Sequence, residues 1–114
     1  GIPAEPLFRS KVFHGFVLGL CALVNDSYVT SNRESGDGRY DIQLMPKNKH
    51  LPGILIELKA EKGCDEKTLK KLSQKALQQI ESKRYDSELI SKGIHHIYKY
   101  GVAFSGKHVC VSGK

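Results

Sequence analysis

The sequence predicts a single α/β (α+β) domain whose elements follow the order α-β-β-β-α-β-β. Two stretches with helical spacing of apolar residues, 7–24 and 69–80, enclose three stretches typical of strands. The 114 residues, 39% of them hydrophobic, are the size of one compact domain with its own core. Because the chain opens with Gly1 rather than Met, we expect residues 1–114 to be one domain of a longer protein.

The first half of the chain predicts one helix and three strands. Apolar residues recur at helical spacing over 7–24 and cover most of the helix surface. A short run of aromatic and β-branched residues at 28–30 predicts the first strand. A polar turn with two glycines, 31–38, separates it from 39–45, where apolar and polar residues alternate. The same alternation over 54–60 predicts the third strand.

The second half predicts a longer helix and two further strands. Asp65 is a suitable N-cap for this helix, and lysines occupy much of the surface opposite its apolar stripe. A break near Tyr85 precedes a short helical piece that ends at Gly93. Residues 94–104 and 108–111 then read as two strands joined by a tight turn.

The charge and the cysteine content of the chain indicate which binding partners and which cellular compartment to expect. A net charge of +6 favours polyanions, with nucleic acid first and anionic membranes second. The most apolar stretch, 16–24, is too short to span a bilayer, so we expect no membrane insertion. Three widely spaced cysteines form neither a zinc pattern nor an even disulfide set, which indicates a reducing, cytoplasmic setting.

Two charged residues interrupt the strand predicted over 54–60. Glu57 and Lys59 project from the same face of a strand that otherwise looks buried, where charges are costly unless paired or bound to metal. Asp41 lies sixteen residues before Glu57, on the preceding strand of the expected hairpin. Asp41 and Glu57 could therefore converge on one hard cation. The alternative is a simple Glu57–Lys59 ion pair at a solvated sheet edge.

This residue set suits metal-assisted hydrolysis of a phosphodiester. A divalent ion on two carboxylates can bind a phosphate oxygen and lower the pKa of a water molecule. The Lys59 ammonium can orient that water or stabilise developing negative charge. Mg²⁺ fits a site with few carboxylates, and Mn²⁺ is the expected substitute.

Five segments carry a resemblance to a known family: HGFVLGL (14–20), SNRESGDGRYDI (31–42), ILIELK (54–59), ALQQI (76–80) followed by Tyr85, and YGVAFSGK (100–107). In this order they resemble the PD-(D/E)XK nuclease superfamily, and more narrowly a branch often found C-terminal to AAA-ATPase-like domains. The resemblance implies a restriction-endonuclease-like αβββαβ core, with a mixed central sheet flanked by helices.

The resemblance also assigns roles residue by residue. It implies that Asp41 and Glu57 are the two strand carboxylates, that Lys59 is the motif lysine, and that Gln79 faces the site from the following helix. The alternative for Gln79 is a solvated helix residue. The family often has a further acid on the first helix, which is absent near His14. Either Glu5 or Glu34 takes that role, or the site has no third carboxylate.

Other polar residues have a functional and a structural interpretation. Arg39 could contact a phosphate, and Glu34 could help hold the metal, or both could belong to a polar turn. Lys71 and Lys75 could follow a DNA backbone, or form an ordinary solvated helix face. His14 is either a core residue or faces the site.

A histidine pair near the C-terminal strands is a weaker candidate. His95 and His96 are adjacent in a stretch predicted as strand, so they would point to opposite faces and could not easily share a metal. We interpret them as structural or surface residues.

Three functions follow from these observations. The first is a metal-dependent nuclease that hydrolyses phosphodiester bonds in DNA with a metal-activated water. The second is a catalytically weak or inactive nuclease-fold module that binds nucleic acid or a partner domain. The third is an RNase or toxin effector on the same scaffold. We expect DNA as the partner, together with an ATPase-like domain in the full-length chain and a homodimer.

Overall fold

The structure of the chain is a computed structural model that describes residues 27–31, 34–35, 38–39 and 41–114. The helix predicted over 7–24, with His14, and the candidate acid Glu5 lie outside the described residues. The described elements are β1 (Ser27–Ser31), β2 (Glu34–Ser35), β3 (Gly38–Arg39), β4 (Ile42–Pro46), β5 (Gly53–Ala60), α2 (Glu66–Ser82), α3 (Ser87–Ser91), β6 (Ile97–Ser105) and β7 (His108–Gly113).

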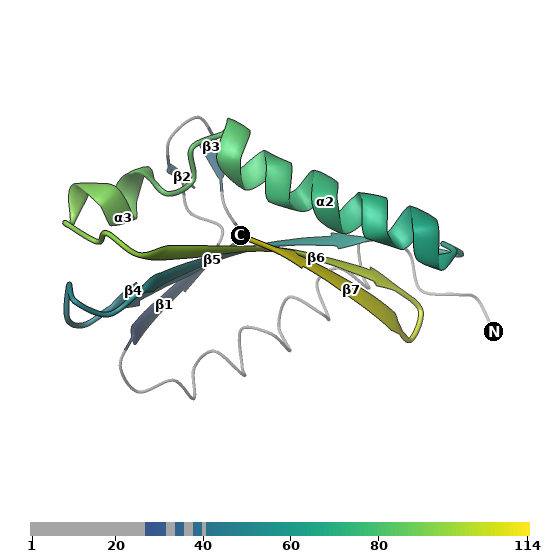
Figure 1. Ribbon diagram of the computed structural model, residues 1–114, viewed down its shortest axis with the longest axis horizontal. Helices are drawn as coiled ribbons and strands as arrows, with labels where there is room; N and C mark the ends of the chain where they lie inside the picture. The colour runs from purple at the N-terminus through teal and green to yellow at the C-terminus, as the bar shows by residue number, and fades with distance from the viewer. Residues whose placement is uncertain (1–26, 32–33, 36–37, 40) are drawn as a thin grey trace.

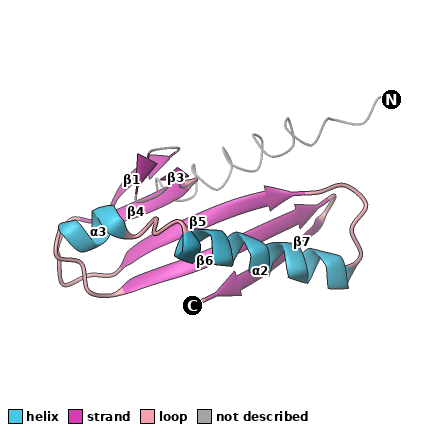
Figure 2. Cartoon of the chain, turned by 90° about the horizontal axis from the view of Figure 1, so that it is seen from above, coloured by secondary structure: helices cyan, strands magenta, loops and turns pink. Residues whose placement is uncertain are grey.

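Five of the strands form one mixed sheet in the order β1-β4-β5-β6-β7. β5 and β6 are parallel, whereas the other neighbouring pairs are antiparallel. The parallel pair needs a crossover connection, which α2 and α3 supply on one face of the sheet (Figure 1). α2 packs against β5, β6 and β7 and runs roughly along the strands (Figure 2). This confirms the predicted mixed α/β architecture.

The alternation of β5 divides the core between the two faces of the sheet. Leu55 packs with residues of the helical segment, in a cluster that comprises Leu55, Ile80, Tyr85, Leu89 and Ile94. Leu58 belongs to a second cluster, together with Ile42 and Leu44. Since Ile42 pairs with Ile56 across the β4–β5 register, the even-numbered residues of β5 face away from α2. Glu57 and Lys59 therefore lie on the face that α2 and α3 cover.

Two features position α2: an N-cap at its first turn and close packing of its backbone against β6. The Asp65 side chain accepts a hydrogen bond of 2.7 Å from the backbone N–H of Thr68, which confirms Asp65 as the N-cap. Gly101 of β6 lies directly beneath the helix, where an added Cβ would overlap the carbonyl oxygen of Ser73. The absence of a side chain at Gly101 thus lets the helix backbone approach the sheet closely.

Two predicted boundaries were wrong. β6 begins at Ile97 and not at residue 94, because Gly93 adopts a positive φ of 82° and Ile94 turns into the core cluster under α3. His95 and His96 consequently precede the strand, and both are exposed. Asp41 lies in a bend immediately before β4, whereas residues 38–39 pair with 34–35 in a separate small hairpin.

Candidate active site

Asp41 is held next to Glu57 at the point where the β4–β5 ladder ends. The last register pair of that ladder is Ile42 with Ile56, so Asp41 would stand opposite Glu57 if the ladder continued. Instead, the Asp41 Oδ2 atom accepts a hydrogen bond of 2.8 Å from the backbone N–H of Leu58. The side chain of Asp41 therefore replaces a backbone acceptor and is fixed against β5.

Glu57 is buried, with 3% of its surface exposed, and its charge is strongly disfavoured. Desolvation, followed by the negative charge of Asp41 and a hydrogen bond with its side chain, raises the pKa of Glu57 from 4.5 to about 8. Lys59 lowers this pKa, but by less. Glu57 Oε1 has no hydrogen-bond partner among the described residues. Two carboxylates therefore lie in contact, one of them has a buried free oxygen, and the nearby Lys59 does not fully compensate their negative charge.

Lys59 is oriented by a chain of side chains that begins on α2. Its Nζ donates a hydrogen bond of 2.6 Å to Gln79 Oε1, and it lies 3.9 Å from Glu57 Oε2. Gln79 Nε2 in turn donates to the hydroxyl of Tyr85, at 3.0 Å. The interpretation of Gln79 as a solvated helix residue is therefore wrong, because both ends of its half-buried amide are hydrogen-bonded to other side chains.

A divalent cation fits this arrangement. The free Oε1 of Glu57 and the neighbouring carboxylate of Asp41 are oxygen donors of the type that Mg²⁺ and Mn²⁺ prefer. A bound cation would offset the like-charge contact that raises the pKa of Glu57. Within the described ranges, no group of three or more His, Cys, Asp or Glu residues could hold a metal ion. The cation would therefore depend on two carboxylates from this part of the chain.

The structure describes only the backbone of Glu34 and Arg39, which the sequence predicts to contribute to the site. The two residues are register partners in the β2–β3 hairpin. Figure 1 shows this hairpin on the same face of the sheet as α2 and α3, which is also the face of Glu57. The side chains of Glu34 and Arg39 lie outside what the structure describes, so their roles stay predictions.

Lys71 and Lys75 are exposed on α2. Together with Gln79 they follow a spacing of four residues, which places all three on one stripe of the helix. The stripe leads from the N-terminal half of α2 to the residue that holds Lys59.

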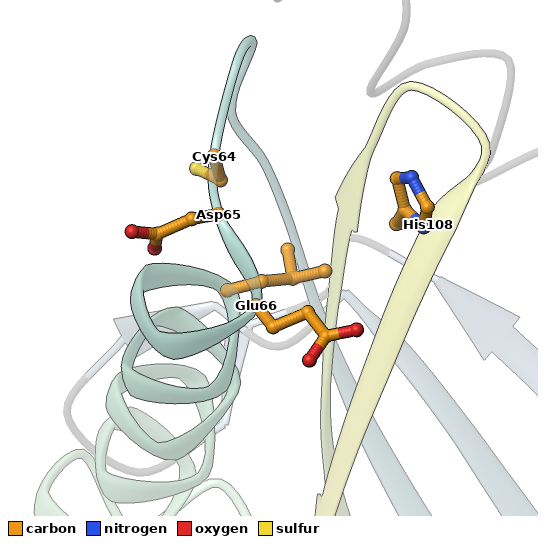
Figure 3. A pocket seen from close by; sticks show the side chains of 5 residues that line it. Cys64, Asp65, Glu66 and His108 are labelled. Carbon is orange, nitrogen blue, oxygen red and sulfur yellow. The ribbon is translucent and has the colours of Figure 1, made fainter.

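A separate pocket of about 250 Å³ lies at the start of α2. It is lined by titratable side chains, but these do not point toward one common position. It is lined by Cys64, Asp65, Glu66, Leu69 and His108. Figure 3 shows the Asp65 carboxylate pointing away from β7 while that of Glu66 points toward it. Desolvation, and after it the neighbouring Glu61, raises the pKa of the Cys64 thiol, which opposes a role as nucleophile.

Sequence reasoning missed two residues beside the site. Tyr85 was recognised only as part of a motif, yet it bonds Gln79 and belongs to the core. Gln43 was assigned no role, yet it is fully buried on β4, two residues after Asp41. In the sequence, Gln43 continues the polar series of the alternating segment 39–45, so the pattern gave no signal that its side chain is buried.

A family model of the PD-(D/E)XK nuclease superfamily matches residues 9–113. The chain therefore belongs to the PD-(D/E)XK nuclease superfamily, and its mixed sheet with a helix is consistent with the restriction-endonuclease-like core of that class. No curated protein and no solved structure gives a significant match. No helix in the described part of the chain is long and apolar enough to cross a membrane.

Proposed function

We propose that the protein is a metal-dependent nuclease that hydrolyses phosphodiester bonds in DNA, with Mg²⁺ as the cofactor and Mn²⁺ as a substitute. The observation that carries the proposal is the contact between the buried Glu57 carboxylate and the half-buried Asp41 carboxylate, beside a lysine that Gln79 holds at 2.6 Å. A structural ion pair would not need a second carboxylate in contact with Glu57, since that contact disfavours the charge.

Each residue has a distinct task in the proposed reaction. Asp41 and Glu57 would hold the cation, which when bound supplies a Lewis acid for the phosphate and for the attacking water. The backbone N–H of Leu58 fixes the Asp41 carboxylate in place. The Lys59 ammonium, oriented by Gln79, would stabilise the negative charge that develops on the phosphate oxygens.

The basic surface supports the choice of a polyanionic substrate. The net charge of the chain is +6, and Lys71 and Lys75 are exposed on the α2 stripe that ends at Gln79. Contacts from lysine to phosphate give affinity without reading bases. We therefore expect binding that depends strongly on salt and weakly on sequence.

Cleavage assays with several DNA forms test the proposal. Supercoiled, linear, single-stranded and branched DNA would be incubated with Mg²⁺, Mn²⁺ or EDTA, and RNA would be included to test the RNase alternative. Cleavage should require metal and disappear in Lys59→Ala and Glu57→Ala. Lys62→Ala and Glu66→Ala make the same exchanges at exposed positions and should cleave normally. Metal-independent cleavage, or cleavage that survives in Glu57→Ala, would refute the mechanism.

A binding module without catalysis is the second candidate. The observation in its favour is that the described residues supply two carboxylates and no third acidic ligand. A gel-shift assay on the same DNA forms separates the two functions. Binding without cleavage under any metal would support the module and overturn the nuclease.

Three further predictions from the sequence concern the assembly of the full-length protein. We propose an ATPase-like domain on the same chain, a homodimer and a cytoplasmic location. Light scattering on the full-length protein would measure the number of subunits directly. A monomer at assay concentrations would contradict the predicted homodimer.

A further inference from the structure

Gln43 is a buried polar side chain that the site described above does not use. It has 0% of its surface exposed, and neither Nε2 nor Oε1 has a hydrogen-bond partner among the described residues. Across the described ranges, Glu57 Oε1 is the one further buried side-chain atom in this condition. Buried amides and carboxylates are nearly always hydrogen-bonded or bound to an ion, so two orphaned groups in one region call for a shared ligand.

Gln43 and Glu57 project from the same face of the sheet. Gln43 pairs with Leu55 in the β4–β5 register, and Leu55 belongs to the cluster under α2 and α3. Glu57 follows Leu55 by two residues, so its side chain leaves β5 on that same face. The two orphaned groups are thus diagonal neighbours on adjacent strands, a separation that long side chains can bridge.

We propose that Gln43 completes the divalent-cation site, with its amide oxygen as a third oxygen donor beside the carboxylates of Asp41 and Glu57. This inference rests on the proposed function. Amide oxygens are accepted ligands of hard divalent cations. The two carboxylates already match the charge of one divalent ion, and a neutral amide adds a donor without adding negative charge to a buried site. The three donors from the described residues therefore suit one ion.

Calorimetric titration of the full chain with Mn²⁺ tests this proposal without measuring catalysis. Gln43→Met removes both polar atoms at nearly the same side-chain length, and Gln78→Met makes the same exchange at an exposed position of α2. Wild type and Gln78→Met should bind one ion per chain with equal affinity. Gln43→Met should bind at least about tenfold more weakly, as expected for loss of a group that holds the metal.

Urea denaturation in EDTA provides a second measurement that does not depend on metal. If the amide is an orphan in the metal-free protein, Gln43→Met should unfold at an equal or higher urea concentration than wild type. A clear loss of stability in EDTA would mean that the protein itself satisfies Gln43, and would overturn the proposal.

The titration also separates this proposal from the one on which it rests. Unchanged Mn²⁺ affinity in Gln43→Met, with one ion bound to wild type, would overturn the role of Gln43 alone. Wild-type protein that binds no Mn²⁺ would overturn both the role of Gln43 and the metal-dependent nuclease.

Discussion

The Nζ atom of Lys59 and the Oε1 atom of Gln79 are 2.6 Å apart, which joins the central strand β5 to helix α2 by a charge-assisted hydrogen bond. Gln79 also donates to the Tyr85 hydroxyl, so its amide has a fixed orientation. The position of the ammonium therefore depends on how α2 is placed over the sheet, as well as on the rotamer of Lys59.

Removing the Gln79 amide should slow cleavage without weakening DNA binding. In Gln79→Ala, Lys59 loses the partner that holds it 3.9 Å from Glu57, and a misplaced catalytic group costs on the order of 10- to 100-fold in rate. Single-turnover cleavage and a gel shift would measure the two effects separately. Gln78→Ala, at the exposed neighbouring position, is the control. Equal cleavage rates for Gln79→Ala and wild type would show that Lys59 does not need Gln79.

The stability of the metal-free protein should fall as the pH rises from about 4.5 to about 8. The pKa of Glu57 is raised to about 8 in the folded protein, against 4.5 ordinarily, because burial and Asp41 disfavour its charge. Over that range the unfolded chain releases this proton while the folded chain retains it, so ionisation favours unfolding. The contribution is fully present below about 4.5 and is lost by the time the pH passes about 8, a change on the order of 5 kcal/mol.

Urea denaturation in EDTA across this pH range would measure the effect. Glu57→Gln has no carboxyl to ionise and should lose the pH dependence in this range. Saturating Mn²⁺ should reduce the dependence in wild type, because a cation on the two carboxylates stabilises the ionised form. The same slope in Glu57→Gln as in wild type would assign the pH dependence to other groups.

Lys71 and Lys75 should contribute to DNA affinity but not to sequence preference. Each lysine that contacts a phosphate releases counterions, so each alanine exchange should lower the slope of log affinity against log salt by about 1. Fluorescence anisotropy at several salt concentrations would give the slopes. Lys70→Ala, on a different side of α2, is the control. If all three variants had the wild-type slope, DNA would not follow the Lys71–Lys75–Gln79 stripe.

Gly101→Ala should destabilise the fold and move α2 away from the site. The added methyl group would meet the backbone oxygen of Ser73, and overpacking of this kind costs about 1–3 kcal/mol. Gly101 is also the β6 register partner of Glu57, so the displacement would occur next to the two acids. In Gly113→Ala the added atom would meet the ring of Tyr100 at 3.0 Å, and this variant should be closer to wild type in urea denaturation.

Local patterns in the sequence predicted the hairpin and the face assignment correctly. The two-residue alternation of β5 is a direct consequence of strand geometry, so it placed Glu57 and Lys59 on one face and Leu58 on the other. The Asp65 cap also depends on neighbouring residues alone, and it was confirmed. Features set by a few adjacent residues could therefore be predicted from the sequence.

Features set by tertiary packing could not be predicted in the same way. Ile94 has the apolar character of a strand residue, yet it packs in the core before β6 begins. The Gln79–Tyr85 contact requires the exact path of the chain between α2 and α3. The orphaned amide of Gln43 becomes evident only when the register with Leu55 and its burial are known.

The hydrogen bond between the Leu58 N–H and the Asp41 carboxylate has a consequence for how variants of this site should be designed. An alanine at position 41 would remove an acidic ligand and would also leave the backbone N–H of Leu58 without its acceptor. A loss of activity in that variant could therefore not be assigned to either change alone. Asparagine keeps an oxygen for Leu58 while removing the negative charge. Comparing Asp41→Asn with Asp41→Ala would separate the effect of losing the negative charge from the effect of losing the hydrogen bond that forms where the β4–β5 pairing ends.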